Sequence, residues 1–493
     1  MPTKNEEKVT PQFPKKYTIL IFGFLMSIAL LFRLYNLSSP IAEWHSWRQA
    51  DTAAVARNFV SGKFDLLRPR FDDLSNIQSG LYNPQGYRMV EFPIYNAIFA
   101  TSYKYLPVLP LEVYGRLTTA FFSLILLAII FIFMKKEHGI VAAFFSGLIF
   151  AVFPYFVFYS RAILPDMTSL SLMFMSIFIL YITYEKKRDF RYQVVSIVIA
   201  TLLASLSVLV KPVSAFYLPL AGFIFLRFYR TRIIKQPLVY FYFIVLFIPF
   251  ILWRQWIHQF PEGIPVFEWL FFQTNTPNGR ENIFFRPAFF RWIFHERINN
   301  LILGGFLSSA LIVGILSKIR KSFFLLTVGL SSLLYLFIFQ GGNLQHDYYQ
   351  IMIIPALVMF CGKGLTVLMA EKKVFTSQIF SAIVILCILA FSWFISYFKV
   401  RDYYAFDPNL IRIAGIIKTV TSPGDKIVTD TIGDTTILYL SGRKGYPAVT
   451  KDLDEIKKDG LSYFVTMNKS VADEIRKKKN PYFESDAVYI FKL

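Results

Sequence analysis

Long apolar blocks are the feature that most constrains the fold of this chain. A helix needs about 20 apolar residues to cross the hydrocarbon core of a bilayer. Eleven blocks approach that length, at residues 17–34, 113–134, 140–159, 167–184, 194–210, 213–229, 237–253, 299–316, 322–339, 351–369 and 379–398. Hydrophobic residues make up 55% of the chain, above the roughly 45–50% of soluble domains. We therefore predict a mainly α-helical, polytopic membrane protein with about eleven transmembrane helices.

The first block follows a short basic tail and raises the question of a signal peptide. The block is long for the apolar region of a signal peptide, and Tyr35-Asn36-Leu37 is not a small-residue cleavage site. We therefore predict an uncleaved first span, preceded by a cytoplasmic tail of residues 1–16.

Basic residues between the blocks predict the orientation. With the N-terminus in the cytoplasm, every short cytoplasmic connection is basic, whereas the outer segments "SRAILPDM" and "GGNLQHDYYQ" hold one and no Lys or Arg. The cytoplasmic residues are Lys135, Lys136, Lys186, Lys187, Arg188, Arg191, Arg227, Arg230, Arg232, Lys235, Lys318, Arg320, Lys321, Lys372 and Lys373. This pattern follows the positive-inside rule and explains much of the net charge of +20 without a nucleic-acid partner. An odd number of spans places the C-terminus outside.

Three longer regions then lie outside the membrane: residues 36–112, residues 254–298 and the tail. The tail alternates β-rich pieces, such as "DKIVTDT" and "LSYFVTM", with helix-like pieces, which is typical of a small α/β domain. The predicted domains are thus the tail of 1–16, a transmembrane domain of 17–398 and an extracytoplasmic α/β domain of 399–493. The last domain contains no catalytic constellation, and we expect it to bind or dock the acceptor.

Ionisable residues gather at the outer ends of the predicted spans. They are Asp51, Glu91, Arg161, Asp166, Lys211, His346 and Asp347. Each has an ordinary explanation: Asp51 and Asp166 would cap helices, and Lys211 would snorkel. Residues from Asp51 onward have helical apolar spacing, which predicts a helix on the membrane surface with Trp44 and Trp47 as anchors. Together the set lies on one side of the membrane, whereas a transporter more often buries such residues in mid-span.

These motifs resemble those of the GT-C-fold membrane glycosyltransferases, in particular the group of protein O-mannosyltransferases and the lipid A aminoarabinose transferase. The resemblance covers about residues 15–400. It rests on "RQADTAAVARNF", "EFPIYN", "RAILPDM", "VKPVSAFYLP" and "HDYYQIMIIP", in this order. The chain departs from the pattern twice: Thr52 stands where many relatives have Glu, and "EFPI" stands where many have Glu-Lys-Pro-Pro.

The resemblance implies an inverting glycosyltransferase that moves a sugar from a polyprenyl-phosphate donor to a glycan, lipid or protein hydroxyl. Asp51 would be the general base, with Asp166 as the second catalytic carboxylate. The residues that would bind substrate or its phosphate are Arg48, Arg57, Arg161, Lys211, His346 and Tyr348. A divalent cation (Mg²⁺, Mn²⁺ or Zn²⁺), which is not universal among such enzymes, would bind Glu91, Asp166 and His346. The uncleaved first span favours the plasma (inner) membrane of a prokaryote, with the active site outside.

Two alternatives stay open. A transporter or flippase of lipid-linked sugars needs charged or broken spans, of which the sequence offers the Lys211-Pro212 break. A glycan polymerase or ligase with lipid-diphosphate donors would use the outer loop 254–298. That loop contains Arg254, His258, Arg280, Arg286, Arg291 and His295 among its basic residues.

Overall fold

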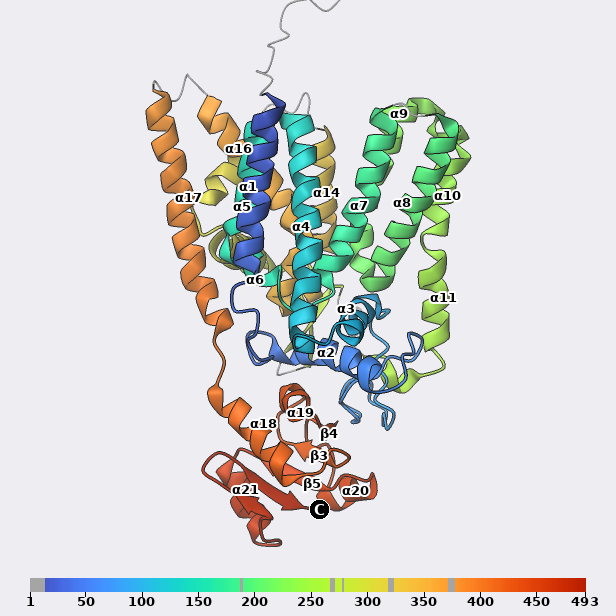
Figure 1. The fold of residues 1–493 in the computed structure, drawn as a ribbon, viewed down its shortest axis with the longest axis vertical. Coiled ribbons are helices and arrows are strands. Elements are labelled where there is room, and N and C mark those ends of the chain that lie inside the picture. The colour runs from blue at the N-terminus through green and yellow to red at the C-terminus, as the bar shows by residue number, and fades with distance from the viewer. Residues whose placement is uncertain (1–13, 187–188, 267–270, 277–278, 318–322, 371–376) are drawn as a thin grey trace, which may run out of the picture.

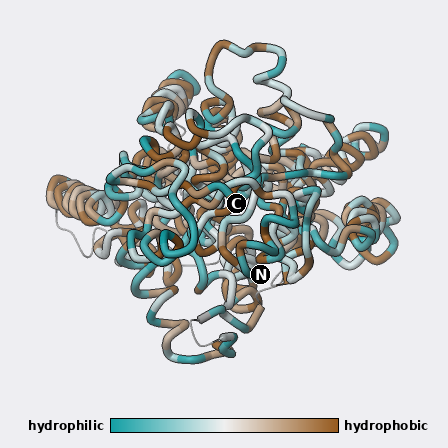
Figure 2. The backbone as a smooth tube through the Cα atoms, turned by 90° about the horizontal axis from the view of Figure 1, so that it is seen from below, coloured by the Kyte–Doolittle hydropathy of each residue, from teal (hydrophilic) through white to brown (hydrophobic). Residues whose placement is uncertain are grey.

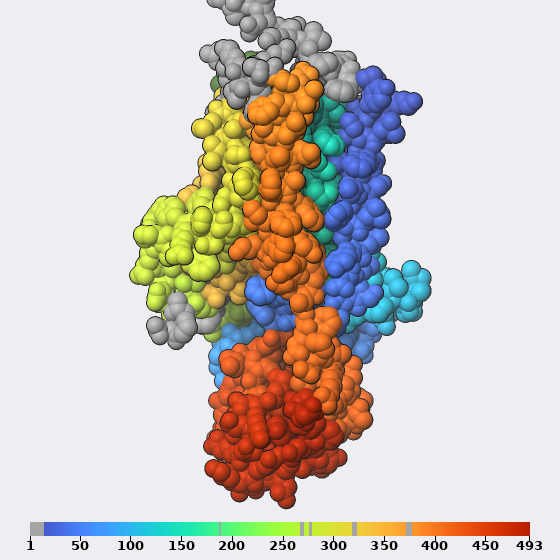
Figure 3. All heavy atoms as spheres, turned by 90° about the vertical axis from the view of Figure 1, so that its left-hand side faces the viewer, coloured from blue at the N-terminus to red at the C-terminus, as the bar shows by residue number. Residues whose placement is uncertain are grey.

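The computed structural model combines a tall bundle of helices with a small sheet domain at one end (Figure 1). It describes residues 14–186, 189–266, 271–276, 279–317, 323–370 and 377–493. Helix α17 (Gln378–Val400) runs along the outside of the bundle and leads into the C-terminal domain, which begins with α18 (Pro408–Val420) (Figure 3). The predicted fold class, a mainly helical membrane protein with a C-terminal α/β domain, is confirmed.

Among the described residues, eight helical stretches are long and apolar enough to cross a membrane, or nine if a bent pair forms one span. They are Lys15–Arg33, Leu111–His138, Asp166–Glu185, Phe190–Val210, Pro212–Lys235, Pro237–Ile257, Asp347–Ala370 and Gln378–Val420. The helices within them are α1 (Lys15–Arg33), α4 (Leu111–His138), α7 (Asp166–Glu185), α8 (Phe190–Val210), η1 (Pro212–Tyr217), α9 (Leu218–Tyr229), η2 (Arg230–Lys235), α10 (Pro237–Val245), α11 (Ile248–Ile257), η5 (Asp347–Ile353) and α16 (Ile354–Ala370), besides α17.

The remaining predicted spans correspond to shorter or broken helices, so the count of eleven stays a prediction. Block 140–159 forms α5 (Ile140–Val152) and α6 (Pro154–Tyr159), and block 322–339 forms α14 (Phe323–Ile338). Block 299–316 bends by 118° between the π-helix η4 (Arg291–Ile302) and α13 (Leu307–Leu316). The bend falls at Gly304, which has a φ of 60°; a Cβ there would lie 1.9 Å from the Ser392 carbonyl oxygen. Only glycine fits such a conformation and such a close approach.

The first outer loop is more deeply packed than the sequence suggests. Its helices α2 (Ser46–Ser61) and α3 (Ile94–Tyr105) lie across the lower end of the bundle (Figure 1). We predicted a surface helix here, but α2 is buried along most of its length, under α19 (Thr436–Ser441) of the C-terminal domain. The small side chains of Ala50, Ala53, Ala54 and Ala56 are buried and allow this close packing.

The C-terminal domain is a five-stranded mixed sheet with helices. Its strand order is β4-β3-β5-β7-β6, with β3 parallel to β4 and β5, and β7 antiparallel to β5 and β6. The elements are β3 (Lys426–Thr429), β4 (Lys444–Tyr446), α20 (Leu453–Lys458), β5 (Tyr463–Thr466), α21 (Lys469–Arg476), β6 (Phe483–Glu484) and β7 (Tyr489–Lys492). Viewed from below, this domain lies over the middle of the bundle (Figure 2).

The first outer loop continues this sheet at its β4 edge. The Leu74 backbone N–H donates to the Gly445 carbonyl at 2.8 Å, and the Gly445 N–H donates to the Asp72 carbonyl at 2.9 Å. Asp73 and Gly445 thereby form a parallel bridge. Because an edge strand carries unpaired backbone groups, this pairing fixes the C-terminal domain on the loop.

The second outer region, 254–298, holds mostly short elements. They are η3 (Pro261–Gly263), the antiparallel hairpin of β1 (Gln273–Thr276) and β2 (Gly279–Asn282), and α12 (Pro287–Phe290). Two further elements are α15 (Gln340–Gln345) and η6 (Arg401–Tyr404), the second of which lies between α17 and α18 in the stretch Gln378–Val420.

The start of α1 and the connection from α9 to α10 lie at the end away from the C-terminal domain (Figure 1). The predicted cytoplasmic residues of these two regions therefore share one end of the bundle. Most of the predicted cytoplasmic tail, residues 1–13, lies outside the described residues. So do the basic residues Lys4, Lys8, Lys187, Arg188, Lys318, Arg320, Lys321, Lys372 and Lys373.

Candidate active site

A cavity of about 540 Å³ lies between the helix bundle and the C-terminal domain. Its walls come from α2, the loop before α3, the break between α8 and η1, α11, η5 and the turn before α19. Lining residues include Trp47, Arg48, Arg88, Glu91, Leu209, Lys211, Val213, Phe250, Trp253, Arg254, His346, Tyr348, Ile432 and Gly433. A small pocket beside it is lined by Asp51 and Pro165, among others, and shares Arg48, Arg88 and Glu91 with the larger cavity.

Asp51 lies in the interior of α2 and not at its start. His45 is the N-cap residue of α2, so the N-cap explanation for Asp51 is wrong. The Asp51 side chain is 1% exposed. The Thr435 hydroxyl donates to its Oδ1 at 2.7 Å, and Arg88 Nη2 lies 2.9 Å from its Oδ2. Asp51 is thus a buried carboxylate, held at the edge of the pocket by a hydroxyl and a guanidinium.

Charges of alternating sign connect Arg48 to Asp166. The Arg48 guanidinium pairs with Glu91. The Lys211 ammonium lies 3.6 Å from Glu91 Oε1 and 3.1 Å from Oδ1 of Asp166, the fully buried first residue of α7. Burial opposes the ionisation of Glu91, but the charges of Arg48, Lys211 and Arg88 outweigh burial and lower the pKa of Glu91 to about 2. Glu91 is therefore an anion at neutral pH.

The predicted metal ligands Glu91, Asp166 and His346 do not form a metal site. Within the part of the chain that the structure describes, no three His, Cys, Asp or Glu side chains gather closely enough to hold a metal ion. The Lys211 ammonium contacts both Glu91 and Asp166, so it supplies the positive charge that a cation would bring. His346 instead stacks on Tyr348, with ring centroids 5.2 Å apart. The residues do not fit a divalent cation, and no step below depends on one.

His346 lines the cavity as a neutral side chain. The pKa of His346 is lowered to about 3, mainly by burial. The charges of His45, Arg297 and Arg48 also lower this pKa, and together they outweigh the opposing charge of Asp347. His346 can therefore offer a hydrogen bond to a phosphate, but no charge at neutral pH. Tyr348, also predicted to bind substrate, is buried beside it, and the Lys211 ammonium lies 5.7 Å from the centre of its ring.

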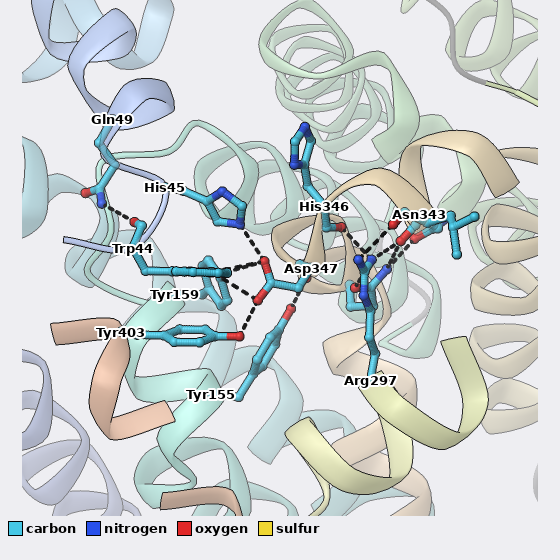
Figure 4. A network of polar contacts seen from close by, with 12 residues as sticks. Trp44, His45, Gln49, Tyr155, Tyr159, Arg297, Asn343, His346, Asp347 and Tyr403 are labelled. Carbon is cyan, nitrogen blue, oxygen red and sulfur yellow. Dashed lines mark hydrogen bonds and ion pairs between the residues drawn. The ribbon is translucent and has the colours of Figure 1, made fainter. Parts of the chain in front are cut away.

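Asp347 is the centre of a polar network that joins distant segments (Figure 4). Its Oδ1 accepts from the Tyr159 hydroxyl at 2.8 Å and lies 2.6 Å from His45 Nε2, while Oδ2 accepts from the Tyr403 hydroxyl at 2.5 Å. The Trp44 indole N–H lies 3.3 Å from both oxygens. The donors come from the first outer loop, α6 and η6. Asp347 therefore holds these segments together. Trp44, which we predicted as a membrane-surface anchor, is half exposed and also takes part in this network.

Two predicted phosphate-binding arginines lie away from both pockets. Arg161 is fully buried and donates to Glu43 Oε2 at 2.5 Å, while Arg116 lies 3.3 Å from the other oxygen of Glu43. A buried guanidinium needs a close counter-ion, and Glu43 supplies it. Arg57 pairs with Asp72 and donates to the Tyr439 carbonyl at 2.6 Å, so it joins α2 to the C-terminal domain.

Sequence reasoning missed Arg88 and Thr435. Arg88 lies three residues before Glu91 in an outer loop, where the positive-inside rule does not call for a cation. Its charge could therefore have identified it as a candidate site residue. Thr435 gave no signal, because 384 residues separate it from Asp51. The role of an uncharged hydroxyl in a separate domain can be recognised only from the packing of that domain against the first outer loop.

Comparison with known proteins shows that the chain is similar to sugar-transfer enzymes. A family model described as dolichyl-phosphate-mannose-protein mannosyltransferase matches residues 110–256. No curated protein sequence matches the chain significantly.

Solved structures match almost the whole chain. ArnT from Cupriavidus metallidurans in the apo state superposes with a TM-score of 0.65 at 12% identity, covering 97% of this chain and 98% of that one. The same protein bound to undecaprenyl phosphate gives 0.63 at 12% identity, with the same coverage. The Archaeoglobus fulgidus oligosaccharyltransferase in complex with Zn and sulfate gives 0.56 at 12% identity, covering 95% of this chain and 72% of that one.

The chain has the GT-C fold. The resemblance that the motifs indicated is thereby confirmed, and it extends past residue 400 into the C-terminal domain, because the ArnT match covers 97% of the chain. The matched part of the chain includes both the helix bundle and the sheet domain, which contributes Ile432 and Gly433 to the cavity wall.

Proposed function

We propose that this protein is a membrane glycosyltransferase that moves a sugar from a polyprenyl-phosphate donor to an acceptor hydroxyl, with inversion, on the outer face of the plasma membrane. The observation that carries the proposal is the meeting of a buried carboxylate, Asp51, with three cations at the junction of two adjoining pockets. The cations are Arg48, Arg88 and Lys211. The GT-C fold and the mannosyltransferase family match over residues 110–256 support it.

Asp51 is the general base of the proposed reaction. The acceptor oxygen attacks the anomeric carbon from the face opposite the phosphate, and its proton passes to the Asp51 carboxylate. The bond from the anomeric carbon to the phosphate oxygen breaks, and its electron pair stays on the departing polyprenyl phosphate. Each oxygen of Asp51 makes one contact in the structure and keeps a second lone pair for the acceptor hydroxyl.

The cations around the cavity stabilise the leaving phosphate. Lys211 lines the cavity and is held by Asp166 at 3.1 Å, whereas its contact with Glu91 is longer, at 3.6 Å, so a phosphate oxygen can take the place of Glu91 beside the ammonium. Positive charge aimed at developing negative charge is a large source of rate enhancement. Leu209, Val213 and Phe250 line the same cavity and give the isoprenoid tail an apolar wall. ArnT, of the same fold, has been crystallised with undecaprenyl phosphate.

The decisive experiment is transfer by Asp51→Asn in membranes supplied with undecaprenyl-phosphate hexoses and pentoses that carry a labelled sugar. Loss of a general base lowers the rate by about 10²- to 10⁴-fold. We expect a loss of that size, both in labelled product and in released undecaprenyl phosphate. Asp65→Asn is the matched control, because Asp65 lies in the same outer loop, pairs with Arg68 and lines neither pocket. Full activity of Asp51→Asn would remove the proposed base.

The same assay separates the two alternatives. A flippase would move the intact donor and release no polyprenyl phosphate. A polymerase that relies on loop 254–298 would lose activity on substitution of Arg286 or Arg291. Both side chains are more than half exposed and neither lines the cavity; of the seven basic residues of that loop, Arg254 does. We expect Arg286→Ala and Arg291→Ala to retain transfer.

A further inference from the structure

The C-terminal domain reaches into the candidate active site through one turn, residues 431–436, which precedes and begins α19. Ile432 and Gly433 line the large cavity, and Thr435 contacts Asp51. Resting on the function proposed above, we propose that Thr435 is a positioning residue for the Asp51 base. It orients the carboxylate and adapts to its change of protonation, so that the C-terminal domain completes the catalytic site in addition to any role in docking the acceptor.

The contact has the geometry of a strong, buried hydrogen bond. Thr435 is 2% exposed, and its hydroxyl oxygen lies 2.7 Å from Asp51 Oδ1. Hydrogen bonds from a hydroxyl to a carboxylate are short and about twice as strong as neutral ones. Arg88 holds the other carboxylate oxygen at 2.9 Å. The two contacts together fix the plane of the carboxylate and leave one lone pair on each oxygen for the acceptor.

The turn that carries Thr435 is itself held firmly. The Thr431 hydroxyl lies 2.7 Å from the Asp434 carbonyl oxygen within the turn and 2.9 Å from the Pro447 carbonyl oxygen after β4, and its one proton is shared between these two acceptors. The Asp434 carboxylate accepts from the Thr436 backbone N–H at 2.8 Å. Ile432 has a φ of 52°, which is rare for a β-branched residue. The Ile432 side chain is exposed, so the hydrogen bonds of Thr431 and Asp434 are what hold the turn.

A second acceptor lets the Thr435 hydroxyl respond when Asp51 takes up a proton. The Trp47 carbonyl oxygen lies 3.3 Å from the same hydroxyl. A hydroxyl has one proton to donate, so while Asp51 is ionised it donates to the nearer carboxylate. Once Asp51 holds the acceptor's proton on its free lone pair and is neutral, its attraction for the hydroxyl proton weakens, and the hydroxyl can turn that proton toward the Trp47 carbonyl. No proton leaves the pair of Asp51 and Thr435 in this step.

Other charged groups also face Asp51, so the pH dependence of transfer reports on the whole set. Arg48 and Arg88 line the small pocket beside Asp51, and Asp72 and Asp73 lie nearby in the first outer loop. Removal of one donor to the carboxylate, with these charges unchanged, favours its protonated form. The acidic limb of the transfer rate against pH therefore moves to higher pH when Thr435 loses its hydroxyl.

The test compares Thr435→Val, Thr435→Ser and Thr436→Val in the full-length protein in membranes, with the labelled undecaprenyl-phosphate sugar that the wild type transfers. We expect Thr435→Val to lower kcat about 10- to 100-fold with KM for the donor nearly unchanged, and to shift the acidic limb upward. Thr435→Ser restores both. Thr436→Val is the matched control: it removes a 2.9 Å bond to Ser46 at the same interface without touching Asp51, and should stay within about twofold of wild type.

Each outcome bears on one proposal. Wild-type kcat and pH profile in Thr435→Val, with an inactive Asp51→Asn, overturn the role of Thr435 and leave the proposed function intact. Equal losses of activity in all three variants mean that the interface is merely structural, and this result also overturns the proposed role of Thr435. An active Asp51→Asn overturns the proposed function itself. Comparable amounts of each variant in the membrane show that a loss of rate is not a loss of folded protein.

Discussion

Lys211 illustrates how much one residue holds together in this molecule. Its ammonium is buried and lies between Asp166 and Glu91, at the break where α8 ends and η1 begins. The sequence left two explanations for it, a snorkelling lysine and a phosphate contact. Its burial against two carboxylates rules out snorkelling, since a snorkelling ammonium reaches water. The same ammonium also stabilises the fold, because two anions would otherwise be buried close together.

We predict that Lys211→Met destabilises the protein by roughly 3–5 kcal/mol, because it leaves Asp166 buried without its counter-ion. Adding Asp166→Asn in the same chain should restore much of the stability but no transfer activity. Thermal unfolding of the purified protein in detergent measures the first effect, and the labelled-sugar assay measures the second. Lys104→Met, at an exposed position of α3, should change stability by less than about 0.5 kcal/mol. Equal stability of Lys211→Met and wild type would contradict the proposed charge balance.

Residue types and positions predicted part of the site. In the candidate site, Asp51, Glu91 and Lys211 could be found because each is an ionisable residue on the predicted outer side of the membrane, where the fold needs none. Arg161 satisfied the same criterion, but its partner Glu43 lies 118 residues earlier in the chain. The sequence does not reveal which charged side chain is neutralised by a buried counter-ion, since that depends on packing between segments far apart in the chain.

At the scale of elements, the segment 72–74 that pairs with β4 contains an unusual carboxyl group. Asp73 is buried, and its Oδ1 accepts from the Ser75 backbone N–H at 2.7 Å. Burial raises the pKa of Asp73 to about 6, with the nearby Asp51 raising it and Arg88 opposing. In the unfolded chain an aspartate has a pKa of about 3.9. Stability from the protonated form is therefore fully present below pH 4 and is lost as the pH rises through 6.

We predict that Asp73→Asn stabilises the protein at pH 8 but not at pH 4. The amide keeps the acceptor for Ser75 and carries no charge to bury. A shift of about two pKa units corresponds to about 3 kcal/mol, which is the expected gain at pH 8. The midpoint of thermal unfolding, compared between the two chains at both values of pH, measures it. A gain of the same size at pH 4 would show that the charge of Asp73 is not the cause.

Elements were predicted well where periodicity or apolar length decides, and poorly where tertiary packing does. Most apolar blocks became helices because their backbone can be satisfied only internally in a membrane. The bend at Gly304 and the break between α5 and α6 were missed, since an apolar block shows length but not curvature. The burial of α2 was missed because its cover, α19, belongs to another domain.

For the molecule as a whole, the proposed topology places the cavity and the C-terminal domain on the outer side, opposite the basic loops. This arrangement follows from the distribution of Lys and Arg, and it can be measured directly. A chain with Cys361 and Cys387 replaced by Ser offers a background without thiols, because these are the two cysteines of the sequence.

We predict that Lys477→Cys in this background reacts with a membrane-impermeant thiol reagent added to intact cells. Lys477 is exposed and follows α21 in the C-terminal domain. Thr231→Cys, exposed in η2 at the opposite end, should react only after the cells are opened. The reverse pattern would place the cavity in the cytoplasm and overturn the predicted orientation.

The contact between Thr435 and Asp51 also sets an order for biosynthesis. Asp51 emerges from the ribosome hundreds of residues before its partner, and β3, just ahead of the Thr435 turn, lies in the sheet between β4 and β5, both translated later. A nascent chain whose helices are already in the bilayer therefore carries an unfinished reaction centre. Under the proposed function and topology, the site is complete only when the C-terminal domain has been translocated and has folded onto the loop, so we expect partly made chains not to consume lipid-linked sugar.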